Sequence, residues 1–173
     1  MSTTERIKTA FERNARAVEL RPGVGQGTAV TRVRLEEGLR CTIEEGRWRL
    51  VADMGEKHGG ANAGPNPGVL GRGALASCMV VGYAMWAARL GVPLDTLEVE
   101  VQADYDARGE YGVDDDVAPG YTRIRWIVTI ESDASEADVM RVLETAEEHS
   151  PYLDLFRNPQ DLRREVRVVS TRR

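Results

Sequence analysis

The spacing of hydrophobic residues changes along the chain between the period of a helix and the period of a strand. Near the N-terminus, Ile7, Phe11 and Val18 recur at helical spacing, which predicts an amphipathic helix that ends before Pro22. Over residues 28–52, apolar and polar residues alternate with a period of two, interrupted by two turns that contain glycine. This pattern predicts a three-stranded antiparallel meander.

The middle of the chain is a long apolar segment. Residues 73–88 contain no charged side chain, and the surrounding pattern predicts one helix from about Pro67 to Leu90, closed by Gly91. A helix without a polar stripe has to be covered on all sides. One twisted sheet covers only one side, so we expect the remaining faces to need a later helix and a second copy of the chain. The burial argument therefore predicts a homodimer.

The second half of the chain returns to alternation and then to helical spacing. Its predicted elements are a strand over 97–105, a polar loop over 106–120, a strand over 124–130, a helix from Ser135 that ends at Pro151, and a last strand over 165–169. The order is helix, three strands, helix, two strands, helix and strand. This order indicates an α+β fold rather than a wound parallel sheet.

Composition and charge argue against several classes of function. The chain has 173 residues, a net charge of −5 and 42% hydrophobic residues, which suits one globular domain and lacks the positive surface that a nucleic-acid partner needs. The uncharged run is shorter than the ~20 residues of a membrane span, so we expect no membrane partner. The first residues have no apolar signal core, which predicts a cytoplasmic protein. The two cysteines and two histidines are scattered singly, and we expect no bound metal: Cys41, Cys78, His58 and His149.

Cys78 lies in the middle of the apolar helix, where two interpretations are open. A free cysteine is often a small buried hydrophobe, whereas a reactive thiol needs an electropositive environment. The helix dipole does not supply one, because Cys78 is about 16 Å from the helix N-terminus. A nucleophilic Cys78 therefore requires an arginine or lysine from another part of the protein or from a partner chain.

The run from Asn66 to Cys78, Asn-Pro-Gly-Val-Leu-Gly-Arg-Gly-Ala-Leu-Ala-Ser-Cys, resembles the central-helix signature of the OsmC/Ohr family of osmotically inducible and organic hydroperoxide resistance proteins. The resemblance covers roughly residues 28–169. It suggests an N-terminal helical extension over 1–21 and an OsmC-like domain over 22–173. The family implies an intertwined homodimer, in which antiparallel sheets wrap around two long central helices, and thiol peroxidase chemistry in defence against oxidative stress.

The resemblance also implies roles for single residues. Cys78 matches the cysteine that attacks the peroxide as a thiolate, and Ser150 stands where the family has its second cysteine, so we expect no function from it. Gly68 replaces a glutamate that orients the activating arginine. Arg40 in the early hairpin is the nearest candidate for that arginine. Arg72 is the other nearby cation, but it lies about 120° from Cys78 around the helix.

Three functions remain open at this point. The first is a one-cysteine peroxidase, in which Cys78 reduces an organic hydroperoxide and an external thiol acts as reductant, without a cofactor. The second is a binding module that holds an apolar ligand at the dimer interface, and the third is a purely structural protein. Cys41, on a predicted strand, is interpreted as structural. The acidic loop that follows Asp104 is interpreted as solvated, because Arg108 stands where a calcium loop needs an oxygen ligand.

Overall fold

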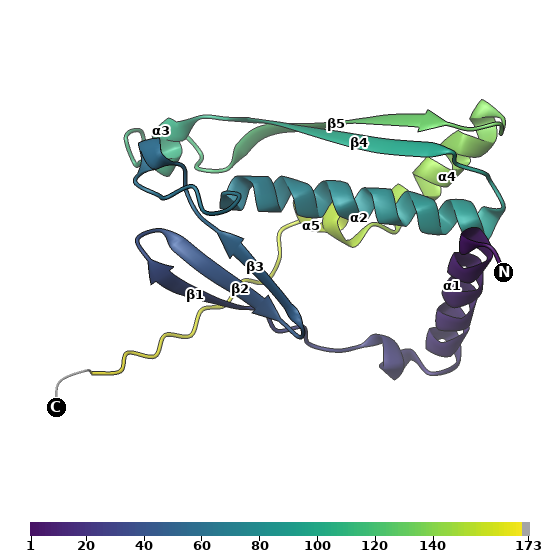
Figure 1. Cartoon of the computed structure of the whole chain (residues 1–173), viewed down its shortest axis with the longest axis horizontal. Coiled ribbons are helices and arrows are strands. Elements are labelled where there is room, and N and C mark those ends of the chain that lie inside the picture. Colours follow the sequence, from purple (N-terminus) through teal and green to yellow (C-terminus); the bar gives the residue numbers. More distant parts are fainter. Residues whose placement is uncertain (171–173) are drawn as a thin grey trace.

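The longest element, α2 (Pro67–Leu90), lies at the centre of the computed structural model, which describes residues 1–170 (Figure 1). The helix begins where the Asn66 side chain accepts a hydrogen bond from the Val69 N–H at 2.9 Å, with Pro67 in the first turn. It ends at Gly91, whose φ of 73° is in the left-handed region that favours glycine. The predicted helix is confirmed with these bounds.

The elements around α2 enclose one of its faces. Leu75, Met79 and Tyr83, spaced by four residues, are at most 2% exposed and form a core with Ala146 and Leu153. Apolar side chains of an antiparallel two-stranded ribbon pack against this core. The elements that supply the enclosure are β4 (Thr96–Tyr105), β5 (Tyr121–Glu131), α4 (Glu136–Glu148) and α5 (Pro151–Arg157), and α1 (Thr3–Leu20) crosses the C-terminal end of α2.

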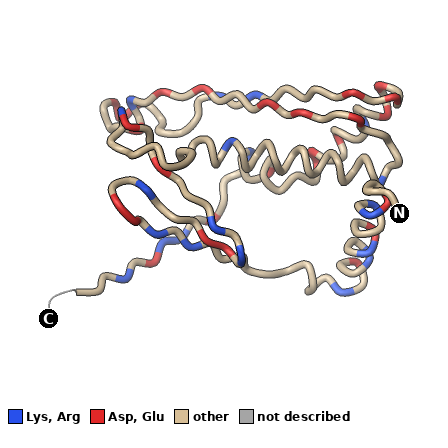
Figure 2. The backbone as a smooth tube through the Cα atoms, viewed as in Figure 1, with Lys and Arg blue, Asp and Glu red and all other residues tan. Residues whose placement is uncertain are grey.

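A second face of α2 is open in the single chain. Val69, Gly73, Ser77, Val81 and Met85 follow one another at four-residue spacing and are all exposed. Val81 has 56% of its surface accessible, although it lies in the middle of the uncharged run of residues 73–88. Figure 2 shows that α2 is nearly free of charged residues, whereas α1, the meander and the β4–β5 ribbon carry them. We call these five residues the open stripe of α2.

The meander forms a sheet of its own. β1 (Arg32–Glu37), β2 (Arg40–Glu45) and β3 (Trp48–Ala52) pair antiparallel in the order β1-β2-β3, as predicted. Figure 1 shows this sheet set apart from the β4–β5 ribbon. Every residue of β1 is exposed, and large apolar side chains such as Leu35 (66%) and Trp48 (65%) have no core beneath them. The meander therefore has large apolar side chains among its charged ones, and these apolar side chains are uncovered in the single chain.

A buried carboxylate fixes the loop between β3 and α2. Asp53 is 2% exposed, and its oxygens accept hydrogen bonds from the backbone N–H groups of Met54, Ala61 and Ala63 at 2.8–3.0 Å. The Ala63 N–H lowers the pKa of Asp53 most, the other two N–H groups and the charge of Arg40 lower it further, and burial opposes them. The carboxylate therefore organises the approach of the chain to the start of α2.

The structure corrects two predictions for the C-terminal part of the chain. Pro151 does not only end a helix: it begins α5, because proline suits the first helical turn and Ser150 caps it. Residues 165–169 do not form a strand within the single chain. Arg167 in this segment forms an ion pair with Glu165, two residues away. No strand of the described residues pairs with the segment. A strand requires a neighbouring strand for its backbone hydrogen bonds.

The remaining predicted elements agree with the structure. The N-terminal helix, the two ribbon strands and the helix from Ser135 all form, so the α+β class is confirmed. The predicted polar loop contains one short helix, α3 (Ala107–Glu110). The division into residues 1–21 and 22–173 stays a prediction. Among the described helices, α2 has the length and apolar composition of a membrane span, features that it shares with the core helices of soluble proteins.

Replacing Asp53 by asparagine should lower the melting temperature at pH 7, because an amide offers one acceptor oxygen to three N–H groups. Since the folded pKa lies below the ordinary value of 3.8, the carboxylate stabilises the fold fully above pH 3.8 and loses this effect as the pH falls through the folded pKa. The difference in melting temperature between wild type and Asp53→Asn should therefore shrink below pH 3.8. Thermal scans from pH 7 to pH 3, with the exposed Asp161→Asn as control, would contradict this account if the difference did not depend on pH.

Candidate functional site

Cys78 and Ser150 lie side by side although 72 positions separate them. The Cys78 Sγ is 3.7 Å from the Ser150 Oγ, within hydrogen-bond distance for sulfur. Cys78 is half-buried in the middle of α2, and Ser150 is 7% exposed at the junction of α4 and α5. The two positions that the sequence singled out for the attacking and second cysteines are thus brought together by the fold.

Local sequence explains the position of Ser150. Its Oγ accepts a hydrogen bond from the Leu153 N–H at 3.3 Å, so the residue is the N-cap of α5. Leu153 itself is 2% exposed in the core formed on α2. The cap and the buried leucine together hold the Ser150 hydroxyl against the sulfur of Cys78.

A buried polar contact joins α4 to α2 near this pair. The Tyr83 hydroxyl, on a side chain that is 1% exposed, donates a hydrogen bond to Glu147 Oε1 at 2.8 Å. Burial raises the pKa of Tyr83 well above its ordinary value of 10, and the neighbouring Glu147 raises it further. The tyrosine therefore remains protonated and able to donate. Because Glu147 is three residues before Ser150, this contact fixes the α4 end from which Ser150 projects.

Arg72 lies beside Gly68, the position at which the family resemblance expects a glutamate. Arg72 Nη1 donates a hydrogen bond to the Tyr121 hydroxyl at 2.9 Å, and that hydroxyl donates to the Gly68 carbonyl at 3.4 Å. A Cβ added to Gly68 would lie 3.2 Å from Arg72 Nη1 and from Asn66 Oδ1. The space next to Gly68 is thus taken up by a guanidinium and a phenol. Tyr121 was missed by sequence reasoning, because a tyrosine at the start of a strand carries no distinctive signal.

Arg40 lies on β2, in the meander that stands apart from α2 in the single chain. Its charge contributes to the lowered pKa of Asp53. The contact described for the Cys78 sulfur is the one with Ser150, so the role of Arg40 beside Cys78 stays a prediction. Cys41 is half-buried on β2, opposite Leu35 and Ala52, and is a free thiol.

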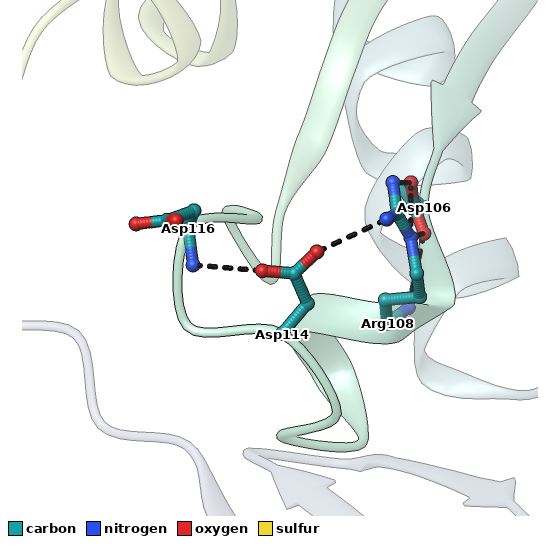
Figure 3. A network of polar contacts seen from close by, with 4 residues as sticks. All are labelled: Asp106, Arg108, Asp114 and Asp116. Carbon is teal, nitrogen blue, oxygen red and sulfur yellow. Dashed lines mark hydrogen bonds and ion pairs between the residues drawn. The ribbon is translucent and has the colours of Figure 1, made fainter.

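The acidic loop is organised by an arginine. Arg108 pairs with Asp106 at 2.7 Å and with Asp114 at 3.0 Å, and Asp114 also accepts a hydrogen bond from the Asp116 N–H (Figure 3). The Arg108 side chain and N–H lower the pKa of Asp106. These carboxylates are therefore engaged in ion pairs and turn contacts. Within residues 1–170 no group of three histidine, cysteine, aspartate or glutamate side chains is placed to hold a metal ion.

Aromatic contacts attach α1 to the C-terminal end of α2. The Phe11 and Trp86 rings meet edge to face with their centroids 5.0 Å apart, and the Arg89 guanidinium lies 4.8 Å from the centroid of each ring. Trp86 also contacts the ring of His149, the residue that precedes Ser150, at 4.9 Å. The N-terminal helix is thus connected through Trp86 to the α4 end that carries the site.

A surface depression of about 270 Å³ lies on the meander, lined by Arg32, Val33, Arg34, Thr42 and Glu44. It is formed by β1 and β2 and does not include Cys78. The Cys78–Ser150 pair lies instead at the contact of α2 with the start of α5.

The comparisons with known proteins agree with the fold. The family model "OsmC-like protein" matches residues 59–164, which contain both Cys78 and Ser150. The chain belongs to the OsmC-like family. A search of curated proteins gives no match.

Solved structures show the same fold at low sequence identity. An OsmC-like protein from Mycoplasma pneumoniae is 17% identical, with a TM-score of 0.67 over 76% of this chain and 89% of that one. An organic hydroperoxide resistance protein OsmC from Legionella pneumophila is 15% identical, with a TM-score of 0.54 over 76% and 90%. An OsmC-like hydroperoxide resistance protein from Jannaschia sp. CCS1 is 19% identical, with a TM-score of 0.52 over 82% and 93%.

Removing the Tyr83 hydroxyl should destabilise the protein, because Glu147 would keep a partly buried carboxylate oxygen without its partner. For Tyr83→Phe we expect a loss of about 1–3 kcal/mol in the free energy of unfolding. Urea denaturation measures it, with Tyr152→Phe as the matched control, since Tyr152 is 40% exposed. Equal effects of the two substitutions would show that the Tyr83–Glu147 hydrogen bond does not stabilise the fold.

Proposed function

We propose that this OsmC-like protein reduces organic hydroperoxides with Cys78 as its peroxidatic cysteine and with an external thiol as reductant. The observation that carries the proposal is the 3.7 Å contact of Cys78 Sγ with Ser150 Oγ. The two positions that hold cysteines in the family are adjacent in this chain, but only position 78 carries a sulfur. Family relatives named as hydroperoxide resistance proteins support the chemistry at the level of the family.

The reaction follows from the presence of a single sulfur. The Cys78 thiolate attacks the terminal peroxide oxygen, an S–O bond forms, the O–O bond breaks, and the alkoxide leaves and takes up a proton. Cys78 is thereby oxidised to a sulfenic acid and the hydroperoxide is reduced to an alcohol. Ser150 cannot form a disulfide, so one external thiol attacks the sulfenic sulfur and releases water. A second external thiol then frees Cys78 and leaves as the oxidised disulfide.

A second copy of the chain completes the site in this proposal. The open stripe of α2 and the meander both carry large apolar side chains that are exposed in the single chain. If the meander of each chain covers the open stripe of the other chain, it brings Arg40 toward helix α2 of that other chain. A guanidinium beside the sulfur is the environment that a reactive thiolate needs.

The alternative function, binding of an apolar ligand without turnover, is favoured by one observation. The resemblance expects a glutamate at position 68 and a cysteine at position 150, and the chain has Gly68 and Ser150. The fold by itself does not decide between the two functions.

The peroxidase proposal is tested by weighing the intact protein after one equivalent of cumene hydroperoxide. We expect a gain of one oxygen on Cys78 in the wild type and in Cys41→Ser. Dithiothreitol added to one sample should reverse this gain, and dimedone added to a separate sample should trap the sulfenic acid as an adduct. The matched substitution Cys78→Ser should abolish it. An unmodified Cys78 together with a co-purified small molecule in native mass spectra would favour the ligand-binding alternative, and oxidation confined to Cys41 would overturn the assignment of Cys78.

Placing a charge on the open stripe should disrupt the proposed homodimer. Val81→Glu would bury a carboxylate between two apolar helices, so we expect a shift from dimer to monomer at micromolar concentration. The control is Val113→Glu, at a position that is 74% exposed in the acidic loop. Sedimentation velocity measures the state. A wild-type monomer, or a dimer that survives Val81→Glu, would contradict the role of the stripe.

A further inference from the structure

The Ser150 hydroxyl has one proton and two lone pairs to distribute among its neighbours. The Leu153 N–H, at 3.3 Å, donates to Ser150 Oγ and so uses a lone pair. The hydroxyl proton is not needed for this cap. Cys78 Sγ lies 3.7 Å from the same oxygen. The hydroxyl can therefore cap α5 and donate to the sulfur at the same time.

Ionisation of Cys78 removes the ambiguity in this contact. A thiol and a hydroxyl can each act as the donor, but a thiolate has no proton and can only accept. The contact then becomes a charge-assisted hydrogen bond from Ser150, a stronger bond than the one between neutral groups. The buried position of Ser150, 7% exposed, limits competition from water for that proton.

The other polar groups on the elements around this part of α2 are engaged elsewhere. The Tyr83 hydroxyl donates to Glu147, and His149 Nδ1 contacts the Thr145 carbonyl at 2.8 Å. The Asp154 carboxylate accepts from Asn158, and the Arg157 guanidinium lies over the Trp126 ring. Arg72, further toward the start of α2, donates to Tyr121.

The ribbon adds no charge on this side. The residues of β4 and β5 that pack against the core are apolar: Leu97, Val99, Val101, Ile124, Trp126 and Val128. Ser150 is therefore the polar side chain that the described chain offers to the Cys78 sulfur.

We propose that Ser150 is a catalytic residue, whose hydroxyl donates a hydrogen bond to the Cys78 thiolate and stabilises it for attack. This inference deepens the proposed peroxidase function and depends on it for the use of the thiolate. It replaces the expectation from the sequence that Ser150 has no function, and the experiments below decide between the two. The same hydroxyl can donate to the sulfur of the sulfenic acid on Cys78. That sulfenic acid persists until an external thiol attacks it.

The test measures the pKa of Cys78 directly, without peroxide. In a Cys41→Ser background, the rate of alkylation by iodoacetamide is followed from pH 5 to pH 10, so that only Cys78 reacts. For Ser150→Ala we expect the pKa to rise by about one unit, since a hydrogen bond to a charged group is lost. Ser150→Thr keeps the hydroxyl, so the pKa of Cys78 in this variant should be close to that in the protein with Ser150.

A further variant separates capping from donation. Ser150→Asp keeps an N-cap acceptor for α5 but replaces the donor by a negative charge, so the pKa of Cys78 should rise more than in Ser150→Ala. Circular dichroism confirms that each variant is folded. A folded Ser150→Ala protein whose Cys78 titrates like the unsubstituted one would overturn the proposal, and so would an equal pKa in Ser150→Asp and Ser150→Thr.

The placement of the two side chains has its own test. In Ser150→Cys with Cys41→Ser, oxidised glutathione should close a disulfide between positions 78 and 150: one thiolate displaces a glutathione, and the second thiol displaces the other. The protein should then lose two hydrogens, measured by intact mass, and failure to form this bond in a folded protein would contradict the placement.

The outcomes for Ser150 and for the peroxidase are distinguishable. If Ser150→Ala raises the pKa of Cys78 but cumene hydroperoxide leaves the wild-type thiol unchanged, the hydrogen bond exists and the peroxidase proposal fails. If the wild-type thiol is oxidised and Ser150→Ala has the same pKa as wild type, the peroxidase stands and the role of Ser150 fails.

Discussion

The structure depends on the covering of one long apolar helix, α2. α2 has no polar stripe, so every face left in water costs the free energy of its exposed apolar surface. The single chain meets this requirement on the face of Leu75, Met79 and Tyr83, which is enclosed by the ribbon and by α4 and α5. The open stripe around Val81 remains, and the meander exposes large apolar side chains such as Leu35 and Trp48. The homodimer that we propose follows from these two surfaces.

The same packing determines the chemistry of the site. Enclosure of α2 by the α4–α5 junction brings Ser150 against Cys78, and the buried Tyr83–Glu147 hydrogen bond fixes the end of α4 beside them. A sulfur in this place is partly shielded from water yet not sealed in a purely apolar core. The fold places one sulfur and one hydroxyl oxygen in contact at this point. In the reaction that we propose, a sulfenic acid on Cys78 would have no neighbouring cysteine at position 150 to resolve it.

Membership in the OsmC-like family is shown by the match over residues 59–164, whereas the solved structures, at 12–19% identity, support the fold. The neighbourhood of Gly68 shows how this chain departs from the pattern that the resemblance implied. A Cβ at position 68 would lie 3.2 Å from Arg72 Nη1 and 3.4 Å from the Tyr121 hydroxyl, so a larger residue there would press on the Arg72–Tyr121 pair. Arg72 is thus engaged with Tyr121 at the start of α2, and the arginine beside Cys78 in our proposal comes from another element.

The sequence by itself determined the elements whose signals are local. The bounds of α2, the meander and the ribbon follow from periodicity and from capping residues such as Asn66 and Gly91, because these signals act over one turn or one strand. The prediction that Cys78 is the attacking cysteine also comes from the sequence, through the motif that precedes it, and it stays a prediction. Tertiary structure decided what lies next to what: the contact of Cys78 with Ser150, the Arg72–Tyr121 pair, and the start of α5 where only a helix end was expected. These contacts join positions 49 to 72 residues apart, and no local pattern encodes which side chains meet across a packed core.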